Sequence, residues 1–187
     1  MHYKSAARLA PRASRLSADT VEARLEARYL DYQYRLVEFL AEHLADVCRT
    51  FGGDMQMPVI LANIGQVSFQ ATAAARHGGD AFEDLPPERR GMTAFRLADV
   101  TGIPRETVRR KLIAMAGRGW IEREKGYWVL TMTGVEANVM KDIMPLDRRS
   151  LQRASRLYCQ LDEIVRTPAA LSPQTRGRGP TSRTVDA

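Results

Sequence analysis

The stretch "TGIPRETVRRKLIAM", residues 101–115, combines dense positive charge with a regular apolar pattern. Four basic residues fall within seven positions: Arg105, Arg109, Arg110 and Lys111. Four apolar residues recur at helical spacing: Ile103, Val108, Leu112 and Met115. Gly102 interrupts the chain just before Pro104, and proline is tolerated in the first turn of a helix. The pattern predicts a helix at 104–117 with one buried face, whose charges are either merely solvated or suited to reading nucleic acid.

The two faces of this helix carry different residue types. Stepping 100° per residue from Val108 places Leu112 and Met115 beside it on the buried face. Three residues then point the opposite way, with Thr107 and Arg109 on their flanks: Glu106, Arg110 and Ile113. Arginine can donate two hydrogen bonds to guanine O6 and N7, and glutamate can accept one from cytosine N4. Basic neighbours suit phosphates, so the arrangement favours a nucleic-acid surface.

The sequence changes period after this helix. Glycines follow, and the runs "WIERE" and "YWVLT" flank "KG" at 125–126, which predicts a β-hairpin. The hairpin segment has three large aromatic residues: Trp120, Tyr127 and Trp128. Such residues pack on the helices beneath a small hairpin more often than they stack on bases, so we favour packing. Alternation alone leaves open whether Tyr127 or Trp128 faces inward.

Composition limits the class of protein. At 187 residues the chain suits one well-packed domain, or one domain with an extra helical layer. Hydrophobic residues make up 44%, which excludes a wholly disordered chain. No apolar run approaches the roughly 20 residues that span a bilayer, and the N-terminus lacks the apolar core of a secretory signal. We therefore expect a cytoplasmic protein with no membrane partner.

The net charge of +6 indicates an acidic partner. Positive charge is concentrated around the opening stretch, because residues 88–131 hold ten Lys or Arg against five acids, a net of 10 − 5 = +5. Residues 19–51 instead hold four arginines against seven acids, a net of 4 − 7 = −3. The alternation of those acids with arginines is typical of an ordinary exposed helix face.

The remaining sequence predicts a mainly α-helical chain with this small β-hairpin. Its expected parts, in order, are a basic disordered tail at 1–16, N-terminal helices at 17–77, the module around the opening stretch at 88–133, C-terminal helices at 134–165 and a disordered tail at 166–187. The two tails lack any apolar period and are rich in small, polar and basic residues.

Caps and breakers refine these boundaries. A cap at Ser17 or Asp19 begins one long helix that runs to about Thr50 and is followed by a second helix. A polar loop comes next, and Thr93 caps a short helix ahead of the opening stretch. The C-terminal part is either one kinked helix or two consecutive helices divided near Pro145, because proline removes a helical hydrogen bond.

The segment "FRLADVTGIPRETVRRKLIAMAGRGWIEREKGYWVL", residues 95–130, resembles the winged helix-turn-helix of bacterial transcription regulators. Within it, "RETVRR" is similar to the recognition helix of the cyclic-AMP receptor protein and Fnr family. That resemblance implies that Arg105, Glu106 and Arg110 read a TGTGA-like half-site. The family's cyclic-nucleotide sensor domain is not expected, since no long β-roll precedes the module. The helical topology resembles MarR-type regulators, in which the terminal helices interlock into a dimer.

Together the resemblances imply a sequence-specific double-stranded DNA-binding transcription regulator, acting as a homodimer on an inverted repeat. Helix 104–117 would enter the major groove, and the wing at 120–131 would contact the backbone or minor groove. The implied backbone or groove contacts are Thr93, Thr107, Arg109, Lys111, Arg123 and Lys125. In a MarR-like protein a small-molecule effector would bind between the dimer helices and the module. Five residues suit such a pocket, although core packing or inter-subunit hydrogen bonds explain them equally well: Tyr29, Tyr32, Asn63, Gln66 and Gln70.

Other functions have less support in the sequence. It contains no GxSxG, P-loop, HExxH or GxGxxG pattern, so we expect no enzyme. The histidines lack carboxylates or cysteines at ligand spacing, so we expect no metal and no cofactor. Two alternatives stay open: a winged-helix scaffold that docks an acidic protein partner, and nucleoid-type DNA binding without sequence preference. The Arg-Glu-Arg arrangement suits base edges better than a carboxylate patch, which favours sequence-specific binding.

Overall fold

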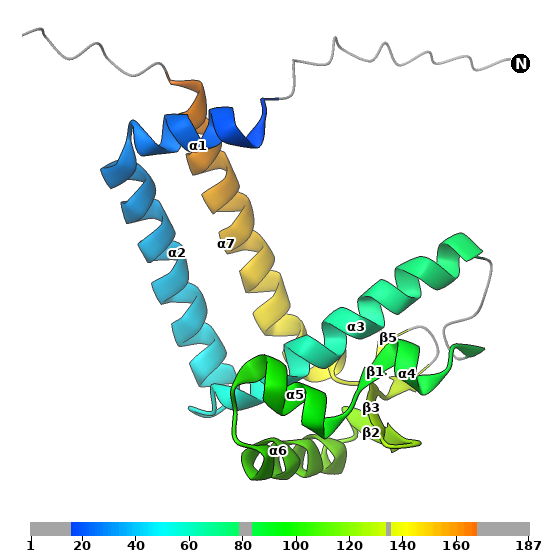
Figure 1. Cartoon of the computed structure of the whole chain (residues 1–187). Helices are drawn as coiled ribbons and strands as arrows, with labels where there is room; N and C mark the ends of the chain where they lie inside the picture. The colour runs from blue at the N-terminus through cyan, green and yellow to red at the C-terminus, as the bar shows by residue number, and fades with distance from the viewer. Residues whose placement is uncertain (1–15, 79–83, 134–135, 168–187) are drawn as a thin grey trace, which may run out of the picture. The chain divides into compact units, whose positions relative to one another are not determined.

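The computed structural model describes residues 16–78, 84–133 and 136–167 (Figure 1). The chain is mainly helical with a small antiparallel sheet, as its sequence predicts. The described residues form two compact units, one of residues 16–37 with 157–167 and one within residues 38–156. Most of the two predicted tails lies outside the described residues. None of the described helices has the length and apolarity that crossing a bilayer requires.

The first unit contains α1 (Ala18–Glu26), the start of α2 (Tyr29–Thr50) and the end of α7 (Met140–Arg166). Ser17 caps α1, because its Oγ accepts a hydrogen bond from the amide of Thr20 at 3.2 Å. The Nη1 of Arg24 donates to the carbonyl of Val165 at 2.8 Å, which attaches α1 to the end of α7.

The prediction of one helix up to Thr50 was wrong, because α1 and α2 are separate helices. At the break the amide of Arg28 bonds to the carbonyl of Leu25 at 3.1 Å, three residues back, which tightens the chain into a turn. Arg28 also donates through Nε to Asp31 in the first turn of α2 at 2.9 Å. No glycine or proline marks this turn, so the local sequence carries no breaker signal.

The second unit is built around α3 (Gln56–Gly78), α5 (Ala94–Thr101) and α6 (Arg105–Gly117). Val108, Leu112 and Met115 are completely buried, which confirms the inward face predicted for the opening stretch. They belong to one hydrophobic cluster with side chains from α3, α5 and the sheet, among them Ile60, Ile64, Leu97 and Ile121. Burial of this stripe fixes the opposite face of α6 toward solvent.

The junction between α5 and α6 follows the predicted caps. The hydroxyl of Thr93 accepts a hydrogen bond from the amide of Arg96 at 3.2 Å at the start of α5. Gly102 ends α5 in the left-handed region with φ 68°, where a side chain is disfavoured. Pro104 precedes the first residue of α6. Two helices are thus joined by a tight turn, with α6 next to the sheet strands in Figure 1.

The sheet has the strand order β1-β3-β2. The predicted hairpin is present as β2 (Ile121–Glu124) and β3 (Tyr127–Leu130), joined through Lys125 and Gly126. The third strand, β1 (Gly91–Met92), pairs with β3, and α4 (Pro87–Arg90) precedes it where a polar loop was predicted. α4 and β1 are each too short to show a periodic pattern in the sequence. β1 forms by pairing with β3, which is distant in the chain.

A second difference lies between the hairpin and α7. A helix was predicted from residue 134, but β4 (Met132–Thr133) pairs with β5 (Glu136–Ala137) and α7 begins at Met140. Residues 134–135 lie outside the described part. α7 is one helix that contains Pro145, rather than two helices. Pro145 is the sixth residue of α7, close to the helix start, so its missing backbone N–H removes one helical hydrogen bond without ending the helix.

Candidate nucleic-acid interface

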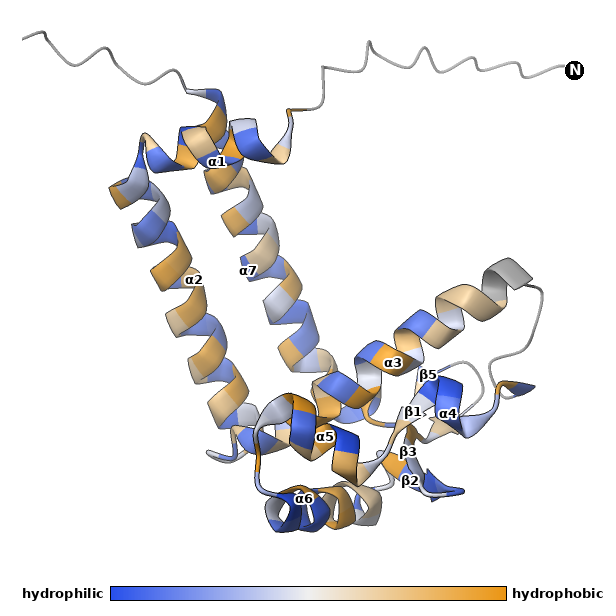
Figure 2. Cartoon of the chain, viewed as in Figure 1, coloured by the Kyte–Doolittle hydropathy of each residue, from blue (hydrophilic) through white to orange (hydrophobic). Residues whose placement is uncertain are grey.

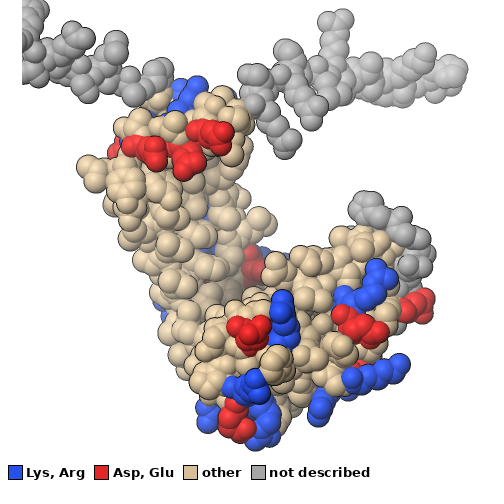
Figure 3. All heavy atoms as spheres, in the orientation of Figure 1, with Lys and Arg blue, Asp and Glu red and all other residues tan. Residues whose placement is uncertain are grey.

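The exposed face of α6 gathers charge at its first turns. Its outward residues are Arg105, Glu106, Arg109, Arg110 and Ile113, all exposed. Hydrophilic residues dominate the N-terminal part of α6 in Figure 2. In Figure 3, Lys and Arg side chains gather over α6 and over the β2–β3 hairpin, with fewer acids between them. The structure therefore places the three predicted base-contact residues on one accessible helix face.

Glu106 and Arg109 are bound to each other across one turn of α6. Arg109 donates through Nε to Oε2 at 2.9 Å and through Nη2 to Oε1 at 2.7 Å. These hydrogen bonds lower the pKa of Glu106 and raise the pKa of Arg109. Glu106 is therefore an ionised acceptor whose carboxylate orientation is set by its neighbour.

Arg105 and Arg110 differ in what surrounds them. The guanidinium carbon of Arg105 lies 4.3 Å from the ring centroid of Phe95, which is on α5. Arg110 forms no hydrogen bond or ion pair with any residue of the described part of the chain. One of the two arginines is thus stacked on a neighbour, and the other keeps its donors available to solvent.

Three of the residues predicted to contact the DNA backbone are bonded within the protein: Thr93, Lys111, and Arg109, which binds Glu106. Lys111 is only partly exposed and forms an ion pair with Asp54, which lies just before α3. Thr93 uses its hydroxyl as the cap of α5, and Thr107 is half-buried. The contact of Lys111 makes it a link between α6 and the start of α3, a role that the sequence did not indicate.

The hairpin carries two further predicted contacts, Arg123 and Lys125, both exposed. Lys125 and Gly126 have φ values of 45° and 92°, the left-handed conformation that two-residue hairpin turns require. Lysine seldom adopts this conformation, and asparagine or glycine is the usual choice at such a position. The turn therefore holds a positive charge at the tip of the hairpin at some cost in backbone energy.

Arg90 holds the end of β2 through hydrogen bonds to Glu124, a role that the sequence did not indicate. Its Nη2 donates to both carboxylate oxygens of Glu124, at 2.9 and 2.7 Å, and its Nε donates to the carbonyl of Leu85 at 3.0 Å. The buried hydroxyl of Ser68 donates to the carbonyl of Arg90 at 2.9 Å. These bonds connect α3, α4 and the hairpin next to Lys125.

Two of the three large aromatic residues of the hairpin segment, Trp120 and Trp128, pack inward, as predicted. Trp120 is buried, donates through Nε1 to Asp142 Oδ2 at 2.5 Å and meets the ring of Phe51 edge-on. Trp128 packs against the main hydrophobic cluster, so it is the inward-facing residue of the pair left open by the sequence. Tyr127 is half-buried.

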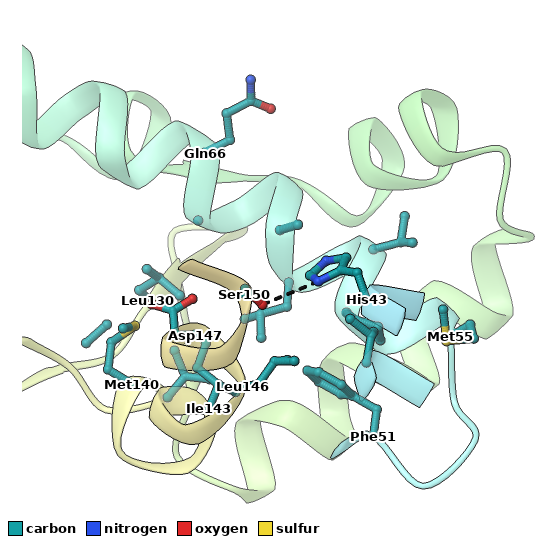
Figure 4. A pocket seen from close by; sticks show the side chains of 18 of the residues that line it. His43, Phe51, Met55, Gln66, Leu130, Met140, Ile143, Leu146, Asp147 and Ser150 are labelled. Atoms are coloured by element: carbon teal, nitrogen blue, oxygen red, sulfur yellow. Dashed lines mark hydrogen bonds between the residues drawn. The ribbon is translucent and has the colours of Figure 1, made fainter. Parts of the chain in front are cut away.

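The second unit also contains an open, largely apolar cavity of about 520 Å³ between α2, α3 and α7 (Figure 4). Of the five residues that suited an effector pocket, Gln66 lines it, and in Figure 4 its side chain points away from the other labelled residues. Asn63 donates to the carbonyl of Val59 at 2.9 Å and Gln70 is exposed. Tyr29 and Tyr32 belong to the other unit, where their rings lie 6.2 Å apart.

Apart from Gln66, the polar residues that line the cavity are not those predicted: His43, Asp147 and Ser150. His43 Nδ1 and Ser150 Oγ lie 3.3 Å apart, and His43 stacks on Phe39 at a centroid distance of 5.6 Å. The described residues contain no cluster of three His, Cys, Asp or Glu that could hold a metal ion. No protein-family model matches the chain, and comparisons with curated proteins and with solved structures find no match.

Proposed function

We propose that this protein is a sequence-specific double-stranded DNA-binding transcription regulator. In this proposal α5, the Gly102 turn and α6 form a helix-turn-helix, and the β2–β3 hairpin is its wing. The observation that carries the proposal is the two-sided character of α6. One face is completely buried, and the other presents an arginine, an oriented carboxylate and further arginines from the first two turns.

The proposed roles follow from hydrogen-bonding capacity. Arg105 and Arg110 donate in pairs to guanine O6 and N7, and Glu106 accepts from cytosine N4. Arg109 orients Glu106 and neutralises nearby phosphates. Arg123 and Lys125 bring positive charge to the adjacent backbone or minor groove. Thr93, whose hydroxyl caps α5, and the half-buried Thr107 are assigned only minor backbone contacts.

A homodimer is supported by an exposed apolar stripe along α2. Its residues are spaced alternately four and three positions apart, the pattern of a helix-helix seam: Leu30, Tyr34, Val37, Ala41 and Leu44. Leu30 is 81% exposed and Tyr34 is 60% exposed, which is unusual for a continuous apolar stripe. Pairing with a second copy would cover it. Two recognition helices about 34 Å apart would then read an inverted repeat.

Selection of bound sequences from a random duplex pool tests the proposal directly. We expect an inverted repeat with TGTGA-like halves. Arg110→Ala should weaken binding to the selected site by about 1–3 kcal/mol and relax one base position. Ile113→Ala, on the same exposed face, is the matched control and should leave the selected base preferences unchanged.

Three outcomes would contradict the proposal in different ways. Binding with a steep salt dependence but no selected sequence would indicate nucleoid-type binding. Failure to bind any duplex at low salt, together with a stable complex with an acidic protein, would indicate an interaction scaffold. If the wild-type chain sediments as a monomer, and Leu30→Glu leaves its sedimenting mass unchanged, the proposed homodimer is contradicted.

A further inference from the structure

We propose that Phe95 is a positioning residue that sets the base preference of Arg105. This inference rests on the proposed function and identifies a specificity determinant outside the recognition helix. Phe95 is the second residue of α5, whereas Arg105 is the first residue of α6. The contact between them is the guanidinium of Arg105 over the Phe95 ring, 4.3 Å from its centroid.

Core packing does not account for Phe95. Its side chain is 58% exposed, and it is absent from the hydrophobic clusters of the described residues. The neighbouring α5 residue Leu97, in contrast, is completely buried. A large aromatic ring therefore sits at the surface beside the charged face of α6. The face of this ring contacts the Arg105 guanidinium, and an aromatic face attracts a cation.

The local backbone holds the two side chains in register. Thr93, two residues before Phe95, caps the start of α5. Gly102 in the left-handed conformation and the following Pro104 determine the direction in which α6 starts. Because both helices also anchor buried residues in the same core, the ring and the guanidinium meet without either side chain being buried.

Stacking restricts an otherwise flexible side chain. A free arginine samples many rotamers and loses that freedom when its planar fork binds two acceptors on one guanine edge. An arginine already stacked on a ring has a smaller set of guanidinium orientations, so less freedom is lost on binding. The adjacent Glu106 is oriented in a comparable way by Arg109. We therefore expect Phe95 to strengthen discrimination at the base pair read by Arg105 and at no other position.

The contact itself is testable in the free protein. The protons on the Arg105 Cδ should show an upfield ring-current shift in NMR spectra. Phe95→Leu should abolish that shift, and Phe95→Tyr should retain it. Because Phe95 is exposed, both variants should keep the helical content of the wild type, which circular dichroism verifies. Unshifted Arg105 protons in the wild type would overturn the inference whatever the protein binds.

The effect of Phe95 on base preference is tested by the random duplex selection and by a double-mutant cycle with Arg105→Ala. Phe95→Leu should reduce base preference at one position of each half-site by about two- to fivefold, the range that corresponds to an exposed cation–π contact. Phe95→Tyr should restore that preference. In the Arg105→Ala background, Phe95→Leu should have no further effect, and Val100→Ala on the same helix should leave every preference unchanged.

The outcomes separate the two proposals. If the wild type selects no sequence, the proposed function and this role of Phe95 both fail. If the wild type selects a motif and Phe95→Leu selects it with the same discrimination, only the role of Phe95 fails. An equal loss at all base positions, or a loss that persists without Arg105, would mean that Phe95 acts on overall affinity and would also overturn the inference.

Discussion

Asp46 of α2 and Arg153 of α7 are joined by a hydrogen bond of 2.8 Å between Oδ2 and Nη2, and both side chains are buried. Arg149 binds the same carboxylate twice, through Nε at 2.8 Å and Nη2 at 3.0 Å. Hydrogen bonds from Arg149 and then Arg153 hold the pKa of Asp46 far below its usual range, against the opposing effect of burial. One carboxylate therefore connects two helices that are more than 100 residues apart in the chain.

Removal of Asp46 should strongly destabilise the fold. Asp46→Ala leaves the buried Arg153 without its partner, and breaking a buried ion pair in this way costs about 3–5 kcal/mol of unfolding free energy. Asp31→Ala, which removes an exposed ion pair with Arg28, is the matched control and should cost about 0–1 kcal/mol. Urea denaturation measures both values. Equal effects of the two substitutions would contradict the importance of the buried pair.

The same carboxylate should make stability depend on acid. Since the folded pKa of Asp46 is lowered, its contribution is present above the unfolded value of about 3.9 and is lost as pH falls toward the folded value. The unfolding free energies of wild type and Asp46→Asn should differ by a constant amount from pH 7 to about pH 5, and the difference should shrink below about pH 4. A difference that stays constant down to pH 3 would exclude this linkage.

Lys125→Asn should stabilise the hairpin and weaken DNA binding. Asparagine before glycine is the preferred pair for a two-residue turn. Replacing Lys125 removes the strain of its left-handed backbone, which should add about 0.5–1 kcal/mol to the unfolding free energy. Loss of one phosphate contact should weaken all duplex sequences alike and lower the salt slope by about one. Thermal unfolding and binding titrations over a salt series measure the two effects. A change in base preference would contradict the backbone role.

Asp54 combines a helix cap with an ion pair, and two substitutions can separate them. Its Oδ1 accepts from the amides of Gln56 and Met57 at 3.2 and 3.1 Å, while Oδ2 pairs with Lys111. Asp54→Asn keeps an oxygen for the cap and loses only the ion pair, whereas Asp54→Ala loses both. We expect Ala to be more destabilising than Asn by about 1 kcal/mol in chemical denaturation. Equal costs would show that the cap contributes nothing.

Gly91→Ala tests the third strand of the sheet. A Cβ at this position would lie 2.5 Å from the carbonyl oxygen of Trp128 and 2.5 Å from Val129 Cγ1, so β1 would have to move away from β3. Overpacking of this kind costs about 1–3 kcal/mol. Gly117→Ala is the control, because its Cβ would meet no atom within 4 Å and its φ is not positive. Similar thermal stabilities for the two variants would argue against a tight β1–β3 contact.

The sequence predicted the module around α6 well because its signals are local. The apolar residues Val108, Leu112 and Met115 set the buried face by spacing alone, and Gly102 and Thr93 mark helix ends by their conformational and capping properties. The β2–β3 turn was equally evident from Lys125-Gly126. The break before α2 was missed, because it depends on hydrogen bonds of Arg28 and carries no glycine or proline.

The candidate interface was predicted only in part, for a related reason. Spacing along one helix established that Arg105, Glu106 and Arg110 share an outward face. It could not show that Arg105 stacks on Phe95, or that Lys111 turns to Asp54, 57 residues away in the chain. The acids of α2 looked like an ordinary solvated face, yet Asp46 is buried.

By itself, the sequence determined the elements whose stability is local: the amphipathic α6, the capped α5 before it and the tight hairpin after it. Periodicity and turn chemistry act within a few residues, so they can be read along the chain. Only the tertiary structure decided which charges remain available. Asp46, Lys111 and Glu124 acquire partners from distant segments, and a charge that is paired within the fold is no longer free to meet a ligand.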